Sequence, residues 1–423
     1  MAGVSKLTET DLHQYFCSFS LEHNLSLLED ENKKTELEHY LFNGQTINVY
    51  VNEFWTSRQR RASSIHEISY RACFKPQLPR FFINLLSNKD DVVYDPFMGR
   101  GTTLVEAALL GRNVIGNDIN PLSKVLTQPR LNIPNYDDVI NRLDNIPINN
   151  NIRADIDLSM FYHPATEAEI VSLRNYLQGR LVQGLTDHVD DWIRMVATNR
   201  LTGHSPGFLS VYTLPPNQAV SPSRQLEINK KRNQKPTYRK VKELVLKKTK
   251  YLLAGMSMVE TAKINTMGKK ALLLDEDARY TKPIKDGTVQ LTVTSPPFLD
   301  IVQYSKDNWL RCWFNHIDEK KVEKEMTIAR SLNEWSSVMG DVFHELYRIT
   351  VKGGWVAFEV GEVRKGKVRL EEQVIPLGTD AGFNCIGVLV NKQLFTKTSN
   401  IWGINNNKSG TNTNRIVLFK KTD

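Results

Sequence analysis

The chain of 423 residues contains few cysteines and no long apolar run. Its four cysteines, Cys17, Cys73, Cys312 and Cys385, lie far apart and form no CxxC pair, which argues against a disulfide framework and against a zinc site. No apolar run approaches the ~20 residues that a membrane span needs, and the N-terminal segment has no signal-peptide core. We therefore expect no membrane association, no bound metal and, by default, a cytoplasmic location.

Acidic residues are scarce in one segment only. The formal net charge is +8, yet the segment from Lys230 to Lys250 alone holds ten Lys or Arg and a single acid, Glu243. The rest of the chain is therefore close to neutral, and the basicity is a local patch. Such a patch favours a polyanionic partner, although a solvated amphipathic helix has the same composition.

Residues 91–118 predict the start of a parallel α/β sheet. DVVYDPF is a short apolar strand, MGRGTT is a glycine loop, and LVEAALLG is a helix that ends at Gly111. The next segment, NVIGND, is predicted to be a second strand. The order of strand, glycine-rich loop, helix and strand is typical of α/β proteins that bind ligands at the sheet edge.

The α/β pattern is interrupted and then resumes. Mostly helical patterning fills the middle of the chain, and strands return in KKALLLDEDAR, VQLTVTSPPF and WVAFEVG. NCIGVLVNKQLF and NRIVLFKK predict an antiparallel hairpin at one edge of the sheet. The first sixty residues show mixed helical patterning without assignable chemistry. We divide the chain into an N-terminal region (1–60), two halves of one α/β domain (61–129 and 266–423) and a helical insertion (130–265).

The glycine loop contains Gly99 and Gly101, which let the backbone turn tightly and approach a ligand at a helix start. It lacks the lysine of a P-loop and the third glycine of a dinucleotide fingerprint. Asp118, after the second strand, could accept hydrogen bonds from ribose hydroxyls or could cap the following turn. Asp275 and Asp277, after the third strand, could bind an adenine amino group or could be solvated turn residues. Together these residues favour an adenosyl ligand.

The fourth predicted strand ends in Ser295, Pro296, Pro297 and Phe298. Two prolines remove backbone donors and leave carbonyls, and a carbonyl beside a serine hydroxyl can hold an amino group with two acceptors. The aromatic ring could stack on a planar base. A stiff exit from the strand is the alternative, because Pro-Pro is common in loops.

In this order, DPFMGRGTT, GNDINP, DAR and TSPPF resemble the cofactor and catalytic motifs of amino-group DNA methyltransferases that use S-adenosylmethionine. HEISYRACFKPQLPRFFI resembles the motif beside the methionine end of the cofactor, and GGWVAFEVG resembles a later strand. The resemblance covers roughly residues 60–125 and 265–423. It implies a Rossmann-like class I methyltransferase sheet, mostly parallel, with a C-terminal antiparallel hairpin and a largely helical insertion.

The resemblance also implies roles for individual residues. The Ser295 hydroxyl and the Pro296 carbonyl would hold the exocyclic amine of a flipped-out base for in-line attack on the methyl group. No cysteine follows a proline, which disfavours the carbon-5 cytosine methyltransferases. The tetrapeptide Ser295, Pro296, Pro297 and Phe298 would be catalytic. The cofactor would be bound by Phe74, Pro76, Asp95, Phe97, Gly99, Gly101, Thr102, Asp118 and Asp277.

A serine in first place, with prolines in second and third, goes with N4-cytosine in this family. N6-adenine methylation, RNA methylation and a catalytically silent nucleic-acid-binding protein stay open as alternatives. The resemblance implies double-stranded DNA as substrate, a cognate restriction endonuclease as functional partner, a monomer, and target recognition by the insertion. Two basic segments are expected to contact DNA phosphates, although each is also consistent with an ordinary exposed surface: Lys230, Lys231, Arg232, Arg239 and Lys240 in the first, and Arg364, Lys365 and Lys367 in the second.

Overall fold

The computed structural model describes residues 8–20, 35–55, 62–70, 73–214, 219–297, 304–326, 329, 331–363, 368–392 and 413–422. Phe298, Arg364, Lys365 and Lys367 lie outside the described residues. The strands are β1 (Glu36–Phe42), β2 (Gln45–Asn52), β3 (Val92–Asp95), β4 (Asn113–Asn117), β5 (Leu272–Leu274), β6 (Val289–Thr294), β7 (Thr350–Val360), β8 (Glu362–Val363), β9 (Val368–Arg369), β10 (Asn384–Lys392) and β11 (Thr413–Lys420).

The helices are α1 (Glu9–Cys17), α2 (Gln77–Leu86), α3 (Thr102–Leu109), α4 (Leu122–Thr127), α5 (Tyr136–Asp144), α6 (Pro164–Val182), α7 (His188–Arg200), α8 (Pro222–Arg232), α9 (Val241–Leu253), α10 (Met258–Gly268), α11 (Tyr304–Phe314), α12 (Glu319–Glu325), α13 (Leu332–Ile349) and α14 (Leu370–Asp380). Two short 3-10 turns, η2 (Ser64–His66) and η3 (Gln128–Leu131), flank the first α/β unit. None of the helices within the described ranges combines the length and the apolar character that a membrane span requires.

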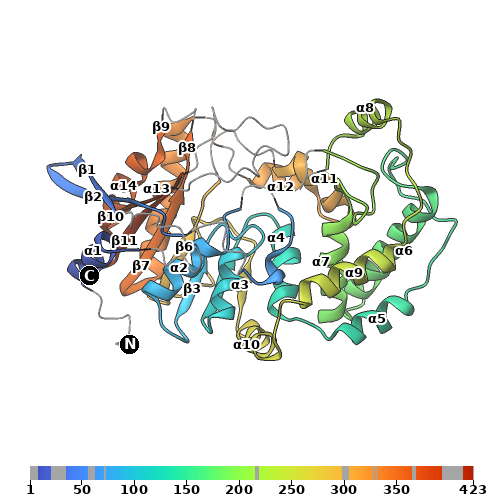
Figure 1. Cartoon of the computed structure of the whole chain (residues 1–423), viewed down its shortest axis with the longest axis horizontal. Helices are drawn as coiled ribbons and strands as arrows, with labels where there is room; N and C mark the ends of the chain where they lie inside the picture. The colour runs from blue at the N-terminus through green and yellow to red at the C-terminus, as the bar shows by residue number, and fades with distance from the viewer. Residues whose placement is uncertain are drawn as a thin grey trace, which may run out of the picture.

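Nine of the described strands form one sheet in the order β1-β2-β10-β11-β7-β6-β3-β4-β5 (Figure 1). The five strands from β7 to β5 run parallel to one another. β11 is antiparallel to both of its neighbours, β7 and β10. The predicted Rossmann-like sheet, mostly parallel with a C-terminal antiparallel hairpin, is therefore confirmed.

The edge of the sheet differs from the prediction. The β10–β11 hairpin is internal, because β2 pairs in parallel with β10 and β1 pairs with β2. The first sixty residues thus contribute a strand hairpin in addition to helix α1. In β2, Val49 and Val51 face one core and Tyr50 faces the other, whereas β1 is almost wholly exposed. An exposed strand has no apolar alternation, which explains why that segment carries no strand signal in its sequence.

Two apolar cores cover the two faces of the sheet. Neighbouring residues of β3 alternate between them, with Val93 in the core beneath α2 and α3 and Tyr94 in the core beneath α13 and α14. Both faces of the central strands are buried, as is usual in parallel sheets. The parallel strands are therefore fixed in register, and their carboxyl ends meet at one edge.

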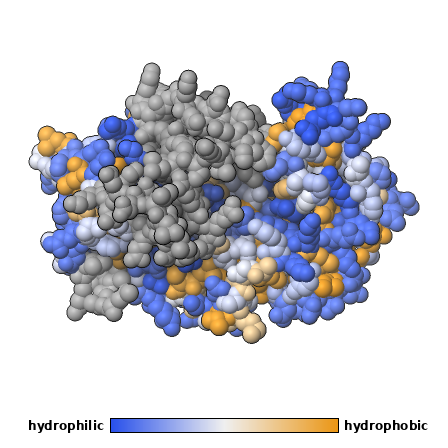
Figure 2. Space-filling view, in the orientation of Figure 1, coloured by the Kyte–Doolittle hydropathy of each residue, from blue (hydrophilic) through white to orange (hydrophobic). Residues whose placement is uncertain are grey.

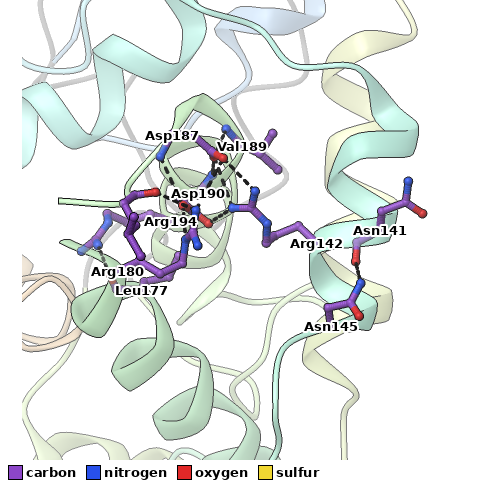
Figure 3. A network of polar contacts seen from close by, with 10 residues as sticks. Asn141, Arg142, Asn145, Leu177, Arg180, Asp187, Val189, Asp190 and Arg194 are labelled. Carbon is purple, nitrogen blue, oxygen red and sulfur yellow. Dashed lines mark hydrogen bonds and ion pairs between the residues drawn. The ribbon is translucent and has the colours of Figure 1, made fainter. Parts of the chain in front are cut away.

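Residues 130–265 are mostly helical, as expected, and lie beside the sheet at the right of Figure 1. Ion pairs join three helices of this insertion (Figure 3). Arg142 of α5 and Arg180 of α6 both pair with Asp187 and Asp190 at the start of α7. Asp187 caps α7, and the Asp190 side chain is 1% exposed. Burial alone would raise the pKa of Asp187, but the hydrogen bonds from Arg142 and from two backbone N–H groups, together with the charge of Arg142, outweigh burial, and the pKa falls to about 2.

Candidate active site

The carboxyl ends of β3, β4, β5 and β6 converge although their motifs are up to two hundred residues apart. The Thr294 hydroxyl at the end of β6 donates to Asp95 Oδ1 at the end of β3, at 2.6 Å. The backbone N–H of Asp118, after β4, donates to the carbonyl of Leu274 in β5, at 3.3 Å. The structure therefore brings the glycine loop, both acidic turns and the Ser-Pro-Pro segment to one edge of the sheet.

Asp95 is buried beside the glycine loop and accepts hydrogen bonds that orient it. It is 1% exposed, and its Oδ1 also accepts from the backbone N–H of Phe97 at 3.1 Å. Burial raises the pKa of Asp95 to about 7, although the hydrogen bonds from Thr294 and Phe97 oppose that rise. The side chain of Phe97 is half-buried against the core beneath α13. Asp95 thus orients the loop through contacts within the protein.

The two glycines of the loop are needed for different structural reasons. Gly99 and Gly101 both have positive φ, at 49° and 71°. A Cβ at Gly101 would lie 2.4 Å from Oγ1 of Thr127, whereas one at Gly99 would lie 3.4 Å from the ring of Tyr70. Thr102 is buried at the start of α3 and accepts from Arg100 Nε at 3.1 Å. Gly101 is therefore required by packing, and Gly99 lies under an aromatic ring that the sequence did not single out.

Asp118 caps the following turn, and its contact with ribose hydroxyls stays a prediction. Its Oδ1 accepts from the backbone N–H of Asn120 at 2.9 Å, which is a turn cap. Its Oδ2 accepts from the backbone N–H of Gly99 at 2.8 Å, which ties the turn to the glycine loop. Burial raises the pKa of this carboxyl. Each carboxylate oxygen can accept more than one hydrogen bond, so the cap leaves acceptor sites for hydroxyl groups of a ligand.

The two acids after β5 differ in their exposure and in their ion-pair partners. Asp275 is exposed and pairs with Lys124 at 2.7 Å. Asp277 is half-buried and pairs with Arg279 at 2.6 Å. Burial alone would raise the pKa of Asp277, but the hydrogen bonds from Arg279 outweigh it and lower the pKa. Asp277 is thus the carboxylate that keeps its charge in the partly shielded position.

Asn117 was missed from the sequence and links the two turns. Its buried amide donates to the carbonyl of Glu276 at 2.9 Å and to that of Pro96 at 3.3 Å, and its Oδ1 accepts from the N–H of Glu276 at 3.0 Å. An amide at the end of an otherwise apolar strand is the signal that could have identified it.

Phe74 is half-buried and Pro76 is buried, both at the entry to α2.

The Ser-Pro-Pro segment contacts residues that come from other elements. Glu359 of β7 accepts from Asn414 Nδ2 at 2.8 Å, and Ser295 lies close enough to the Glu359 carboxylate to lower its pKa. Glu359 is 6% exposed, and burial raises its pKa. Trp335 Nε1 donates to the carbonyl of Pro297 at 3.0 Å. Pro296, between Ser295 and Pro297 in the chain, is buried. A lone acid in the apolar strand WVAFEVG is the sequence signal for Glu359.

The predicted phosphate contacts differ in exposure. Lys230, Lys231, Arg232 and Lys240 are exposed on or beside α8 and α9. Arg239 is half-buried, and its guanidinium donates to backbone carbonyls of the loop before α8. Its contact with DNA stays a prediction, because the structure gives this side chain partners within the protein. The remaining three, Arg364, Lys365 and Lys367, lie in a segment that the structure does not describe.

The strand order and the glycine loop after β3 are those of a Rossmann-like α/β sheet. Residues 15–126 match the family described as DNA methylase, N6_N4_Mtase. The chain is 40% identical over 76 residues to the type II methyltransferase M.MjaII of Methanocaldococcus jannaschii, which is 18% of this chain and 14% of that protein. It is 30% identical over 126 residues to M.MthZI of Methanothermobacter thermautotrophicus, which is 29% of this chain and 35% of that protein.

A third relative aligns over a longer stretch. M.BsoBI of Geobacillus stearothermophilus is 22% identical over 357 residues, which is 77% of this chain and 68% of that protein. The matches to the first two relatives span well under two thirds of their length. The resemblance to amino-group methyltransferases of type II systems is confirmed by these matches. They do not distinguish N4-cytosine from N6-adenine.

Proposed function

We propose that this protein transfers a methyl group from S-adenosylmethionine to the N4 amine of a cytosine in duplex DNA, as the modification enzyme of a type II restriction-modification system. The convergence of the glycine loop, Asp118 and the Ser-Pro-Pro segment at one sheet edge is the observation that carries this proposal. The matches to type II methyltransferases support DNA as the substrate. Serine as the first residue of the tetrapeptide supports cytosine.

The residues at the sheet edge fit an adenosyl cofactor. Asp118 has carboxylate acceptor sites left for ribose hydroxyls, and Asp277 remains ionised beside Arg279 to accept from the adenine amine. The methionine end would lie along the glycine loop, with Phe74 and Pro76 closing the pocket. When bound, S-adenosylmethionine supplies an electrophilic methyl group on a sulfonium.

The Ser-Pro-Pro segment would hold the amine of the substrate. With its O–H directed to the nearby Glu359 carboxylate, Ser295 would keep the lone pairs of its hydroxyl oxygen free to accept from the cytosine N4 amine. The Pro296 carbonyl is the second acceptor, and Phe298 would stack on the base. The N4 lone pair is delocalised into the ring, so two fixed acceptors favour the geometry in which it can attack.

The transfer would form a bond between N4 and the methyl carbon while the bond between that carbon and sulfur breaks and leaves its electron pair on sulfur. One amine proton leaves, and the Ser295 hydroxyl with the Glu359 carboxylate behind it provides an acceptor chain for that proton. The target base must leave the duplex to reach this edge. A monomer acting once on each strand of a palindromic site would protect host DNA from a cognate endonuclease.

The direct test is to incubate the purified protein with duplex DNA and S-adenosylmethionine, digest the DNA and identify methylated nucleosides by mass spectrometry. N4-methylcytosine is expected. N6-methyladenine would contradict the assignment of the base, and unmodified DNA beside methylated RNA would contradict the assignment of the substrate.

Two variants separate cofactor binding from chemistry. Asp118→Ala should abolish measurable binding of S-adenosylmethionine in calorimetry. Ser295→Ala should bind the cofactor normally but turn over on the order of 100-fold more slowly, the scale of removing one preorganised hydrogen-bond partner. Full activity in the Ser295 variant would refute the role assigned to its hydroxyl.

A further inference from the structure

Helix α8 stands out because almost none of it is buried. Of its residues Pro222–Arg232, only Gln225 is buried. In Figure 1 the helix stands apart from the rest of the insertion, and Figure 2 shows a largely hydrophilic protrusion at the same place. An ordinary surface helix buries an apolar stripe. The stability of α8 must therefore come from other contacts.

Polar contacts hold the inner face of α8. Gln225 Nε2 donates to the carbonyl of Tyr212 at 3.1 Å, and Asn229 Nδ2 donates to the carbonyl of Met160 at 2.8 Å. Gln234, after the helix, donates to Asn229 Oδ1 at 2.8 Å. The guanidinium of Arg232 lies 3.7 Å from the centre of the Tyr212 ring. Contacts at helix positions i, i+4 and i+7 fix the rotation of α8 about its axis.

This rotation determines which side chains face outward. At 100° per residue, Ser223, Glu227 and Lys230 lie opposite the anchored face, and all three are exposed. They form a stripe ~10 Å long, about three base-pair steps. Arg224 and Lys231 flank the stripe and are also exposed. The stripe thus carries a hydroxyl, a carboxylate and an ammonium, groups that bind base edges.

The two side chains of the ion pair on this face can bind other partners instead of each other. Arg224 and Glu227 pair at 2.5 Å, with side chains that are 64% and 66% exposed. An exposed pair of this kind contributes little to stability. Both side chains can therefore bind another polar surface at small cost.

The segment before α8 is tied to the catalytic side of the molecule. The N–H of Ala219 donates to the carbonyl of Asp307 at 3.1 Å, and Trp309 Nε1 donates to the carbonyl of Val220 at 3.2 Å. Both partners belong to α11, the helix that follows the Ser-Pro-Pro segment in the chain. In Figure 1, α8 and β8 both lie in the upper part of the view, α8 at the right and β8 left of centre, and β8 directly follows the carboxyl end of β7.

We propose that α8 is a recognition helix that enters the major groove of DNA beside the target base. Ser223, Glu227 and Lys230 face base edges, while Arg224 and Lys231 contact flanking phosphates. The major groove, ~12 Å wide, accepts one α-helix, and the two cations that flank the stripe suit its phosphate walls. This assignment rests on the proposed function, and it gives the stripe a role in sequence selection beyond phosphate binding.

The test compares the wild type with a Glu227→Ala/Lys230→Ala variant on a library of randomised duplexes, with methylated sequences identified afterwards. We expect the variant to accept additional bases at one to three adjacent positions, and to methylate the cognate site ~10- to 100-fold more slowly, because each lost base contact is a factor of this order. Its affinity for S-adenosylmethionine should be unchanged, which shows that the variant is folded.

A matched control removes two exposed lysines at the opposite edge. Lys282 and Lys285 precede β6 and lie at the amino ends of the parallel strands, so Lys282→Ala/Lys285→Ala should keep both the motif and the rate. An α8 variant with an unchanged motif overturns the base-reading role, including when its rate falls uniformly on all sequences. A wild type that methylates no duplex overturns the proposed function as well, so the two failures are distinguishable.

Discussion

At the residue scale, the candidate catalytic serine depends on a carboxylate from another strand. Glu359 of β7 accepts from Asn414 and lies close enough to Ser295 for that residue to lower its pKa. Its burial raises its pKa, so the ionised form is gained only above the usual pH range of a glutamate. Ser295 alone therefore does not define the chemistry of this edge.

Glu359→Gln should reduce turnover on the order of 10-fold or more while leaving S-adenosylmethionine binding intact. A glutamine amide can donate as well as accept, so the orientation of the serine hydroxyl is no longer unique. In the wild type, turnover should rise as pH passes the raised pKa of Glu359, because the carboxylate can only accept, whereas the protonated acid can also donate to Ser295 and occupy its lone pairs. This rise of turnover with pH should be missing in Glu359→Gln. The exposed Glu323 offers a control, since Glu323→Gln should keep the wild-type profile. A pH profile of Glu359→Gln identical to that of the wild type would contradict the positioning role.

At the element scale, the glycine loop shows that two neighbouring glycines of one motif can serve different purposes. Gly99 lies under Tyr70, whereas Gly101 packs against Thr127 of α4. The sequence supported a ligand role for both, because a strand, glycine loop and helix have that meaning in many proteins. The helix that contacts Gly101 comes later in the chain, so only the packed structure reveals its constraint.

Gly101→Ala should lower the free energy of unfolding well beyond the effect of backbone strain. Gly184 gives a matched control, because it has a similar φ of 68° but a Cβ added there would meet nothing within 4 Å. We expect Gly184→Ala to cost about 1 kcal/mol, as for alanine at positive φ, and Gly101→Ala to cost about 1–3 kcal/mol more from overlap with Thr127. Urea denaturation measures both. Equal losses would show that packing against Thr127 does not constrain Gly101.

At the scale of the whole molecule, the helical insertion is stabilised by its own ion pairs. Asp190 is buried and accepts from guanidinium groups of two other helices, so it joins α5, α6 and α7 (Figure 3). Such a buried charge is costly when it loses its partners but fixes the geometry when they are present. The network therefore fixes the relative positions of α5, α6 and α7 in the insertion that also carries α8.

Asp190→Asn should destabilise the protein by about 2–4 kcal/mol, because it leaves two partly buried guanidinium groups facing a neutral amide. Glu243→Gln removes an exposed partner of Lys240 and should cost less than ~0.5 kcal/mol. Chemical denaturation of the two variants gives the comparison. DNA binding should fall more than S-adenosylmethionine binding in Asp190→Asn, since the network lies in the insertion. A loss as small as that of Glu243→Gln would mean that the network does not stabilise the insertion.

The sequence by itself determined the local parts of this protein. Apolar periodicity, the glycine loop after DVVYDPF and the prolines after LTVT act over a few residues, and they correctly predicted the parallel strands, the first α/β unit and the helical insertion. The order of the motifs carried the resemblance to amino-group methyltransferases.

Only the tertiary structure decided how distant segments meet. It placed β2 beside β10, because the pairing of a strand depends on which edge of the sheet is unoccupied. The exposed β1 has no apolar periodicity that would have predicted a strand. It placed Glu359 against Ser295 and bound Arg239 to loop carbonyls, because such contacts depend on the packing of whole elements. Local periodicity depends on neighbouring residues, whereas the site and the outward face of α8 depend on the packed chain.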